Sequence, residues 1–401
     1  MKILVVGSRV PWPLKDGGAI AIYRILKGLS DAGAEVVFFS YNTRKHFVSE
    51  KDIAGHFSFC KVYTHYIDST PSLFGAIQHI FSGQNYNISR FYNSEAIHVL
   101  SRIVEQESPD VIHFDSLYST PLLSAVRDKN IPLVLRQHNV EFKIWEKLAA
   151  TASNPLKKWY FRHLSSQLKT YELATLREFT AVVPITAEDK ELFAAAVPGL
   201  KYHTCSVGIP EADVQTEFNS DLPSFFHIGS MEWMPNVQGV NWLLTEVWPL
   251  LKEKLPRAVL HLAGKGMQPG DPRFSGSADV FVHGEVASAE DFMLGGGIMC
   301  IPLFSGGGVR VKMLEAMSLG IAVVSTETGA SGAGAHHGTH FLLSSTAPEF
   351  ADSMFQLATN SSLRENLTTA ARKMVQSQYG LSTLSANLLN FYKSLRNLPH
   401  S

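Results

Sequence analysis

Short apolar runs alternate with amphipathic stretches of helical spacing from one end of this chain to the other. Runs such as Lys2–Val6, Val111–Phe114 and Ile298–Pro302 are too apolar to form a sheet with one face in water. They are typical of parallel strands that helices cover on both faces. The alternation therefore predicts an α/β protein made of doubly wound parallel sheets.

The chain of 401 residues is too long for one ordinary core, so we expect two domains. The segment Ile209–Pro223 is polar and separates two series of predicted strands, the first of which ends with Tyr202–Val207. We predict two Rossmann-like domains, residues 1–210 and 211–380, that face each other across a cleft, and a C-terminal helix within 381–401 that packs back on the first domain.

The segment Ile301–Thr326 carries the most functional information. Its pattern predicts a strand, a glycine loop, a helix that begins near Val309, a tight turn and a second strand. A loop without side chains lets a bulky group approach the backbone N–H groups at the helix N-terminus. The glycines of this loop are Gly306, Gly307 and Gly308.

Two basic residues, Arg310 and Lys312, are predicted in the first turn of that helix, where the helix dipole disfavours cations. An anion that contacts both explains their placement, so the loop predicts a phosphate or diphosphate site. Glu315 follows as an acceptor for hydroxyl groups. The alternative is an ordinary glycine-rich connection with solvated basic residues.

Charge and composition argue against several classes of protein. The net charge of −1 implies no general attraction to nucleic acid, and no nucleic acid partner is expected. No apolar run approaches the roughly 20 residues that cross a bilayer. The GxGxxG and P-loop patterns are absent, which argues against nicotinamide cofactors and ATP-type phosphoryl transfer. We expect a cytoplasmic protein without a cofactor.

Metal ligation is not expected either. The cysteines lack CxxC spacing and are interpreted as buried thiols of a reducing compartment. Three histidines in a Gly/Ala-rich loop resemble a metal cluster at first sight, but no cysteine or aspartate lies near them, and we interpret them as exposed loop residues. The residues concerned are Cys60, Cys205, Cys300, His336, His337 and His340.

Several motifs occur in a characteristic order: ITAEDKELF, GSMEWMPNVQGVNWLL, LHLAGKG, FVHGEV, and the glycine loop followed by LEAMSLGIAVVST. With them, nearly the whole chain resembles the retaining GT-B glycosyltransferases of group 1, also called family 4. The resemblance implies a nucleoside diphosphate sugar as donor, bound by the second domain. It also implies an acceptor bound mainly by the first domain, and no bound metal.

On the donor side, Glu315 matches the second glutamate of the family's E-x7-E motif, which usually holds the ribose hydroxyls. Gly307 replaces the first glutamate, which usually contacts the donor sugar. The family's arginine and lysine after the first strand of this domain are also missing, and the loop offers Trp233 with its neighbours Glu232 and Asn236. We hypothesise that the two basic residues of the glycine loop supply this charge instead.

FVHGEV looks like the segment that lines the nucleobase in this family. Backbone groups near Glu285 and Val286 are expected to read the base edge, and His283 belongs to the same site unless it is only a strand-end residue. Gly229, which opens the second domain's first motif, and Val309 complete the predicted donor-binding residues.

RQHNVEF follows a predicted strand of the first domain. In the family a histidine here often contacts the donor sugar near the reacting carbon, which makes His138 the candidate, with Asn139 and Glu141 as alternatives. A structural histidine is the other interpretation.

Two further features of the first domain are predicted at the same edge. Gly17 and Gly18 resemble the family's small-residue loop that faces the diphosphate and the acceptor, or they form a plain turn. Asp115 ends a predicted strand, where it either accepts a hydrogen bond from an acceptor hydroxyl or caps the next helix.

Residues 143–178 combine seven basic with three acidic residues and several aromatic ones. Such a stretch suits contact with an anionic membrane or an acidic acceptor, and a solvated helix pair with inward aromatics is the alternative.

The sequence as a whole predicts a retaining glycosyltransferase that moves a sugar to an acceptor hydroxyl of a glycan or lipid-linked molecule, in glycan or polysaccharide biosynthesis. The alternative is a non-catalytic GT-B protein that binds a nucleotide or glycan. Release of the diphosphate would be assisted by Arg310, Lys312 and the helix N-terminus.

Overall fold

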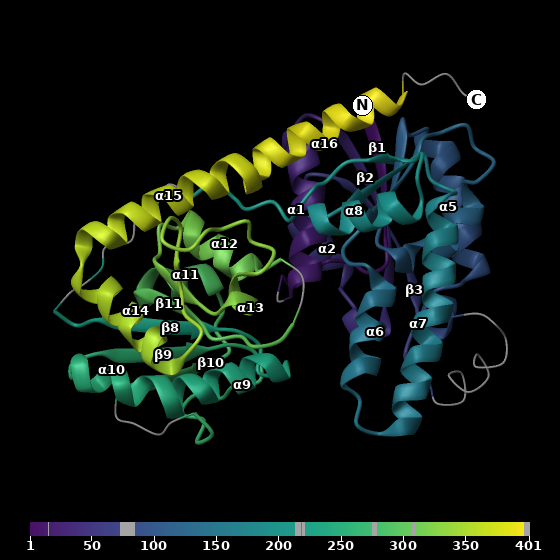
Figure 1. Ribbon diagram of the computed structural model, residues 1–401. Coiled ribbons are helices and arrows are strands. Elements are labelled where there is room, and N and C mark those ends of the chain that lie inside the picture. Colours follow the sequence, from purple (N-terminus) through teal and green to yellow (C-terminus); the bar gives the residue numbers. More distant parts are fainter. Residues whose placement is uncertain are drawn as a thin grey trace. The chain divides into compact units, whose positions relative to one another are not determined.

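The computed structural model describes residues 1–14, 16–72, 85–212, 218, 221–274, 279–306 and 309–396 (Figure 1). The chain forms two compact units. The first contains Met1–Gly208 and the C-terminal segment from Leu381, and the second contains Ile209–Gly380. Each unit has its own parallel sheet and its own core.

The first unit is built on a seven-stranded sheet in the order β3-β2-β1-β4-β5-β6-β7, and all neighbouring strands are parallel. The strands are β1 (Lys2–Gly7), β2 (Glu35–Thr43), β3 (Lys61–Ile67), β4 (Val111–Asp115), β5 (Leu133–Gln137), β6 (Ala181–Pro184) and β7 (Lys201–Tyr202). The helices of this unit are α1 (Gly17–Asp31), α2 (Glu50–His56), α4 (Tyr86–Ser89), α5 (Ser94–Glu107), α6 (Glu141–Thr151), α7 (Pro155–Leu176), α8 (Ala187–Ala196) and α16 (Leu381–Arg396).

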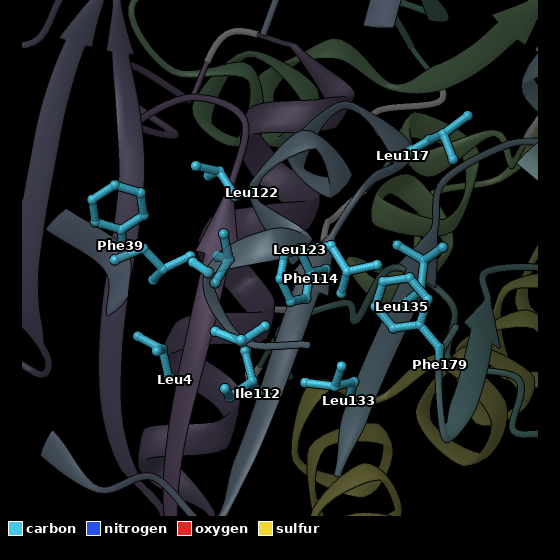
Figure 2. Close-up of a cluster of buried hydrophobic side chains, with 14 of the residues drawn as sticks. Leu4, Phe39, Ile112, Phe114, Leu117, Leu122, Leu123, Leu133, Leu135 and Phe179 are labelled. Carbon is cyan, nitrogen blue, oxygen red and sulfur yellow. The ribbon is translucent and has the colours of Figure 1, made fainter. Parts of the chain in front are cut away.

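Alternate residues of the central strands enter cores on opposite faces of this sheet. Leu4 and Ile112 belong to the cluster shown in Figure 2, which also receives Leu122 from a 3₁₀ segment, Leu117–Ala125. Ile3 belongs to the other cluster, which α1 and α16 complete. Burial on both faces is the reason that the strands carry almost uninterrupted apolar sequence.

The second unit has a six-stranded parallel sheet in the order β10-β9-β8-β11-β12-β13. Its strands are β8 (Ser224–Ile228), β9 (Val259–Ala263), β10 (Val280–Gly284), β11 (Ile298–Ile301), β12 (Val323–Ser325) and β13 (Leu342–Leu343). Its helices are α9 (Met234–Trp242), α10 (Trp248–Lys254), α11 (Ala289–Gly296), α12 (Val311–Ser318), α13 (Glu327–Ala330), α14 (Ala347–Thr359) and α15 (Ser361–Tyr379), with a π-helical segment, Leu243–Val247.

Two local predictions differ from the structure. The strand expected over Tyr202–Val207 is only the two-residue β7, although Cys205 and Val207 are buried. Burial alone explains their apolar character, because a buried residue need not belong to a sheet ladder. The helix of the glycine loop begins at Val311, so Arg310 occupies its N-cap position with a non-helical backbone instead of its first turn.

Candidate functional site

The carboxyl ends of β8, β9 and β11 lie at one edge of the second sheet, because these strands are parallel neighbours. The backbone is tightly packed at this edge. Gly229 N–H donates to the carbonyl of Ala263 over 3.0 Å, and Gly264 N–H donates to that of Gly284 over 2.8 Å. A Cβ atom on Gly264 would lie only 1.8 Å from the Gly229 carbonyl oxygen. The predicted donor residue Gly229 therefore has a clear structural role at this edge.

The glycine loop follows β11 and leads into α12. Gly306 has a positive φ of 119°, and a Cβ atom on it would meet the Trp233 ring at 2.7 Å. Glycine is thus required here by both conformation and space. Gly307 and Gly308 lie outside the described residues. Val309 is half-buried against the core cluster that contains Met313.

Arg310 and Lys312 have different surroundings. The Arg310 guanidinium lies over the Trp233 ring, 5.6 Å from the ring centroid, and Nη2 donates to the carbonyl of Thr328 over 3.4 Å. Burial lowers the pKa of Arg310. The Lys312 ammonium instead pairs with the carboxylate of Glu315 at 2.8 Å. Lys312 and Glu315 thus form one ionic unit on the first turns of α12, with the carboxylate mostly buried.

Of the predicted nucleobase residues, His283 lies on β10, and Glu285 and Val286 follow its end. β10 is at the edge of the sheet and is separated from β11, which leads into the glycine loop, by β9 and β8. His283 Nε2 shares a hydrogen bond of 2.9 Å with Nδ1 of His261 on β9, and its ring packs against Phe292. Glu285 is exposed, whereas Val286 packs against the core. Val286 and Val309 nevertheless pack against the same core cluster, although two strands lie between β10 and β11.

In the first unit, the carboxyl ends of β4 and β5 carry a buried polar cluster. His138 Nε2 lies 3.0 Å from Asp115 Oδ1, and the same oxygen accepts a hydrogen bond from Arg136 Nη1 over 3.2 Å. His113 Nε2 lies 3.4 Å from it, and its other ring nitrogen contacts the Tyr392 hydroxyl of α16. Asp115 therefore fixes the position of the His138 ring through its Nε2 atom.

The charges in this cluster compensate one another. Asp115 and Arg136 are completely buried, and His138 keeps a side-chain exposure of 15%. Burial on its own raises the pKa of Asp115, but His138 and Arg136 outweigh it, so that the pKa lies well below its usual value. Asp115 is therefore a carboxylate that orients its neighbours. Ser116 occupies the N-cap of the next 3₁₀ segment, so the predicted cap by Asp115 was wrong, whereas its hydrogen bond to an acceptor hydroxyl stays a prediction.

Asn139 and Glu141, the two alternatives to His138, make local contacts at the start of α6. Asn139 Nδ2 lies 3.5 Å from Glu141 Oε1, and the Tyr118 hydroxyl donates to Glu141 Oε2 over 2.8 Å. Glu141 is buried, which raises its pKa. Glu172 of α7 accepts hydrogen bonds from the backbone N–H groups of Glu141 and Phe142. Glu141 and Glu172 therefore both have hydrogen-bond partners within the first unit.

Gly17 and Gly18 form the first turn of α1, which Asp16 caps by accepting from Ala19 N–H over 3.0 Å. A Cβ atom on Gly17 would meet nothing within 4 Å, whereas one on Gly18 would meet the Arg9 guanidinium at 2.9 Å. Gly17 therefore faces open space, which leaves room for a ligand at this helix N-terminus.

Some residues in these clusters were not singled out by the sequence. His113 is one of them, although it alternates with apolar residues on β4 and shares a face with Asp115, and two polar groups on one face of a buried strand are a signal that points to it. Glu172 lies near the C-terminal end of α7, and Tyr392 is 279 residues from His113. Nothing in the local sequence marks either of them.

Residues 143–178 cover most of α6 and all of α7, which run side by side in Figure 1. Part of the aromatic surface packs inward, as Trp145 does against Phe161. Other apolar side chains face solvent: Leu156 is 73% exposed and Trp159 is 53% exposed. The helix pair thus presents an apolar and basic surface.

The remaining predicted groups make local contacts. The ring of His340 accepts from His336 N–H, and that of His337 accepts from Leu343 N–H. Over the described ranges, no three His, Cys, Asp or Glu residues are placed to share a metal ion. In the same ranges no helix is long and apolar enough to cross a membrane.

A cavity of about 830 Å³ lies away from these sites, at the amino ends of β11 and β12. It is lined by Ile298, Ala322 and basic residues of α15, among them Arg372. Because ligands of open parallel sheets bind at the carboxyl ends of the strands, this cavity is not the expected donor site.

Comparison with protein families and solved structures gives consistent matches. Residues 15–209 match the family described as "Glycosyltransferase Family 4", and residues 223–360 match "Glycosyl transferases group 1". A protein of Klebsiella pneumoniae, described as an uncharacterized 44.6 kDa protein in the cps region, is 24% identical over 94% of this chain and 96% of its own.

Solved structures share the fold over nearly their whole length. Sucrose-phosphate synthase from Thermosynechococcus elongatus has a TM-score of 0.69 at 14% identity and covers 98% of this chain and 99% of its own. Anabaena HepE in complex with UDP and glucose has a TM-score of 0.65 at 14% identity, with 98% and 100% covered. A point mutant of S. aureus TarM in complex with fondaparinux, alpha-GlcNAc-glycerol and UDP has a TM-score of 0.66 at 12% identity, with 99% and 100% covered.

Proposed function

Because this chain is a glycosyltransferase of the GT-B fold, with group 1 and family 4 domains, we propose that it transfers a sugar from a nucleoside diphosphate sugar to an acceptor hydroxyl, with retention of anomeric configuration. The observation that carries this proposal is the arrangement at the start of α12. There a glycine loop, a half-buried arginine and a lysine–glutamate pair lie at the carboxyl edge of a parallel sheet. HepE and TarM, which share the fold, were crystallised with UDP.

In this proposal, Arg310 and Lys312 contact the diphosphate together with backbone N–H groups of the glycine loop. Positive groups in fixed positions stabilise the charge that grows on the leaving diphosphate. Glu315 then accepts hydrogen bonds from the ribose hydroxyls, and its pair with Lys312, at 2.8 Å, couples ribose binding to diphosphate binding. His283, Glu285 and Val286 remain the proposed nucleobase segment.

His138 is the proposed catalytic residue of the first unit. Asp115 fixes the ring at Nε2. In this proposal the other ring nitrogen, Nδ1, makes the hydrogen bond to the donor sugar. Gly17 and Gly18 offer the N-terminus of α1 to the diphosphate or the acceptor.

The chemistry needs no strong protein base. The bond between the anomeric carbon and the diphosphate oxygen breaks, the acceptor oxygen bonds to that carbon, and the acceptor proton passes to the departing phosphate oxygen. We propose that this occurs without a bound metal ion.

An activity assay with a donor panel tests this function. Purified protein is incubated with UDP-, GDP- and ADP-sugars and glycan or lipid-linked acceptors, and release of nucleoside diphosphate is followed. We expect release from one donor, and a loss of at least about tenfold in Glu315→Gln, because one hydrogen bond to a charged group contributes about 1.5–3 kcal/mol. Glu253→Gln, a change at an exposed residue of α10, is the matched control.

Two outcomes would count against the enzyme. If turnover is unchanged in Glu315→Gln, the proposed role of Glu315 in donor binding is wrong. Tight nucleotide binding without turnover for any donor and acceptor would favour the non-catalytic GT-B protein, an alternative that the replacement of the first motif glutamate by Gly307 supports.

We further propose that α6 and α7 contact an anionic membrane from the cytoplasmic side, where a lipid-linked acceptor is accessible. Basic residues and the exposed Leu156 and Trp159 suit this contact. The free thiols of the three cysteines agree with a reducing compartment. The description of the Klebsiella relative as a protein of the cps region agrees with a role in polysaccharide biosynthesis.

Flotation with vesicles of anionic and neutral lipid tests the membrane proposal. We expect the protein to float with anionic vesicles at low salt and to lose binding in the double variant Leu156→Ser, Trp159→Ser, because the apolar contact is removed. Phe47→Ser, a change of a residue with 64% exposure elsewhere in the same unit, is the control. No flotation of the unmodified protein would exclude this contact.

A further inference from the structure

Trp233 lies in the loop between β8 and α9, at the N-cap position of α9. Its side chain is not part of the core of the second unit: 38% of the residue is exposed. One face of the ring is covered by the Arg310 guanidinium, whose central carbon is 5.6 Å from the ring centroid. A residue 77 positions earlier in the chain thus supports the arginine of the glycine loop.

The same ring also touches the glycine loop itself. A Cβ atom on Gly306 would approach Cζ2 of Trp233 to 2.7 Å and Nη2 of Arg310 to 3.0 Å. Only a residue without a side chain lets the ring, the guanidinium and the loop backbone come this close together. Trp233, Gly306 and Arg310 are therefore one packed group, which we call the tryptophan platform.

Charge in the loop before α9 is neutralised rather than offered to a ligand. Glu232 pairs with Lys265 at 2.8 Å, next to Trp233 in the sequence. The loop therefore contributes an aromatic face to the site. An aromatic face attracts a guanidinium and holds its plane, and this attraction grows where water is partly excluded, as it is around the half-buried Arg310.

We propose that Trp233 is a positioning residue for the diphosphate of the donor, holding the Arg310 guanidinium and the Gly306 backbone in the arrangement that the diphosphate meets. This inference rests on the proposed function, because it takes the diphosphate as the ligand of the glycine loop. It deepens that function by assigning a role to a side chain where the resemblance led us to expect basic residues.

Binding of a nucleoside diphosphate compared with its nucleoside tests the platform. The affinities of UDP, GDP and ADP are measured, together with those of uridine, guanosine and adenosine. The nucleoside diphosphate that binds most tightly and its nucleoside are then used to compare the variants. The ratio of the two affinities reports the contribution of the diphosphate alone. The variants are Trp233→Ala, Trp233→Phe, Arg310→Ala and the double alanine variant, with Tyr92→Ala as a control at an exposed aromatic residue of the first unit.

We expect Trp233→Ala to weaken diphosphate binding by about 3- to 30-fold, the range of a cation–π contact, and to change nucleoside binding by less than about twofold. Trp233→Phe keeps an aromatic face and should retain most of the affinity. In the Arg310→Ala background, Trp233→Ala should have little further effect, because the ring acts through the guanidinium. Tyr92→Ala should leave both affinities unchanged.

The outcomes separate this inference from the function on which it rests. If the unmodified protein binds no nucleoside diphosphate more tightly than its nucleoside, the diphosphate site itself is wrong. If it does, but Trp233→Ala keeps the full preference for the diphosphate, or loses both ligands equally, or adds its full effect to that of Arg310→Ala, then Trp233 is not a positioning residue.

Discussion

Asp115 Oδ1 is hydrogen-bonded to Arg136 on β5 and to His138 just after that strand, although the Asp115 side chain is completely buried. A buried carboxylate is costly unless cations and donors surround it, and here Arg136 and His138 supply both. At the residue scale, the orientation of His138 is therefore fixed by a completely buried neighbour on β4.

We predict that Asp115→Asn strongly destabilises the first unit, by about 3–5 kcal/mol, because it leaves the buried Arg136 without a counter-charge. Urea unfolding measures this change. Asp68→Asn, which breaks an ion pair with Arg44 on the surface, is the control and should shift the midpoint very little. Equal shifts of the midpoint in the two variants would show that the buried cluster contributes no more to stability than the surface ion pair does.

At the scale of elements, α6 is held at its start by α7. The N-cap residue Val140 provides no side-chain hydrogen bond, and Glu172 instead accepts from the N–H groups of Glu141 and Phe142 over 3.2 Å each. Gln137 at the end of β5 donates to the same carboxyl group over 3.0 Å. One acidic residue thus joins two helices to the strand that precedes His138.

We predict that this junction makes stability depend on pH. Burial raises the pKa of Glu172 to about 8, far above its ordinary value of 4.5. Because the folded state binds this proton more tightly than the unfolded state, its stabilising effect is complete below pH 4.5 and is lost as the pH rises towards 8. Glu172→Gln should remove most of this slope in urea unfolding between pH 5 and pH 9. A slope identical to that of the unmodified protein would contradict the assignment.

At the scale of the whole molecule, the chain leaves the first unit after Gly208 and returns to it after Gly380. The returning helix α16 packs on α1 and contributes to the core beside β1 and β2 (Figure 1). The packing is close, since a Cβ atom on Gly28 of α1 would lie 2.0 Å from the Ser385 hydroxyl oxygen. The first unit is therefore complete only with the end of the chain.

We predict that Gly28→Ala destabilises the protein by about 1–3 kcal/mol, because the added methyl group has no space against α16. Gly55→Ala is a suitable control. Gly55 lies in α2, and a Cβ atom there meets nothing within 4 Å, so alanine should stabilise by about 0.5–1 kcal/mol. Thermal unfolding compares the two variants. A stabilising effect of Gly28→Ala would contradict the close packing of α16 on α1.

Much of the fold could be predicted from the sequence. The α/β class and the two Rossmann-like parallel sheets are confirmed, because strands buried on both faces leave an unmistakable apolar pattern. The residue at which a helix begins was harder to predict. Arg310 was expected inside a helix, but the backbone becomes helical only at Val311, since side-chain spacing does not report where the φ and ψ angles change.

By itself, the sequence determined the layered architecture and the glycine loop at the carboxyl edge of the second sheet, because both depend on short-range patterns. Only the tertiary structure decided which side chains meet. Trp233 contacts Arg310, Asp115 contacts His138, and Tyr392 contacts His113. The order of neighbouring strands brings the first two pairs together, and the packing of the returning helix α16 brings the third. Local spacing carries no information about strand order or helix packing, and therefore none about these contacts.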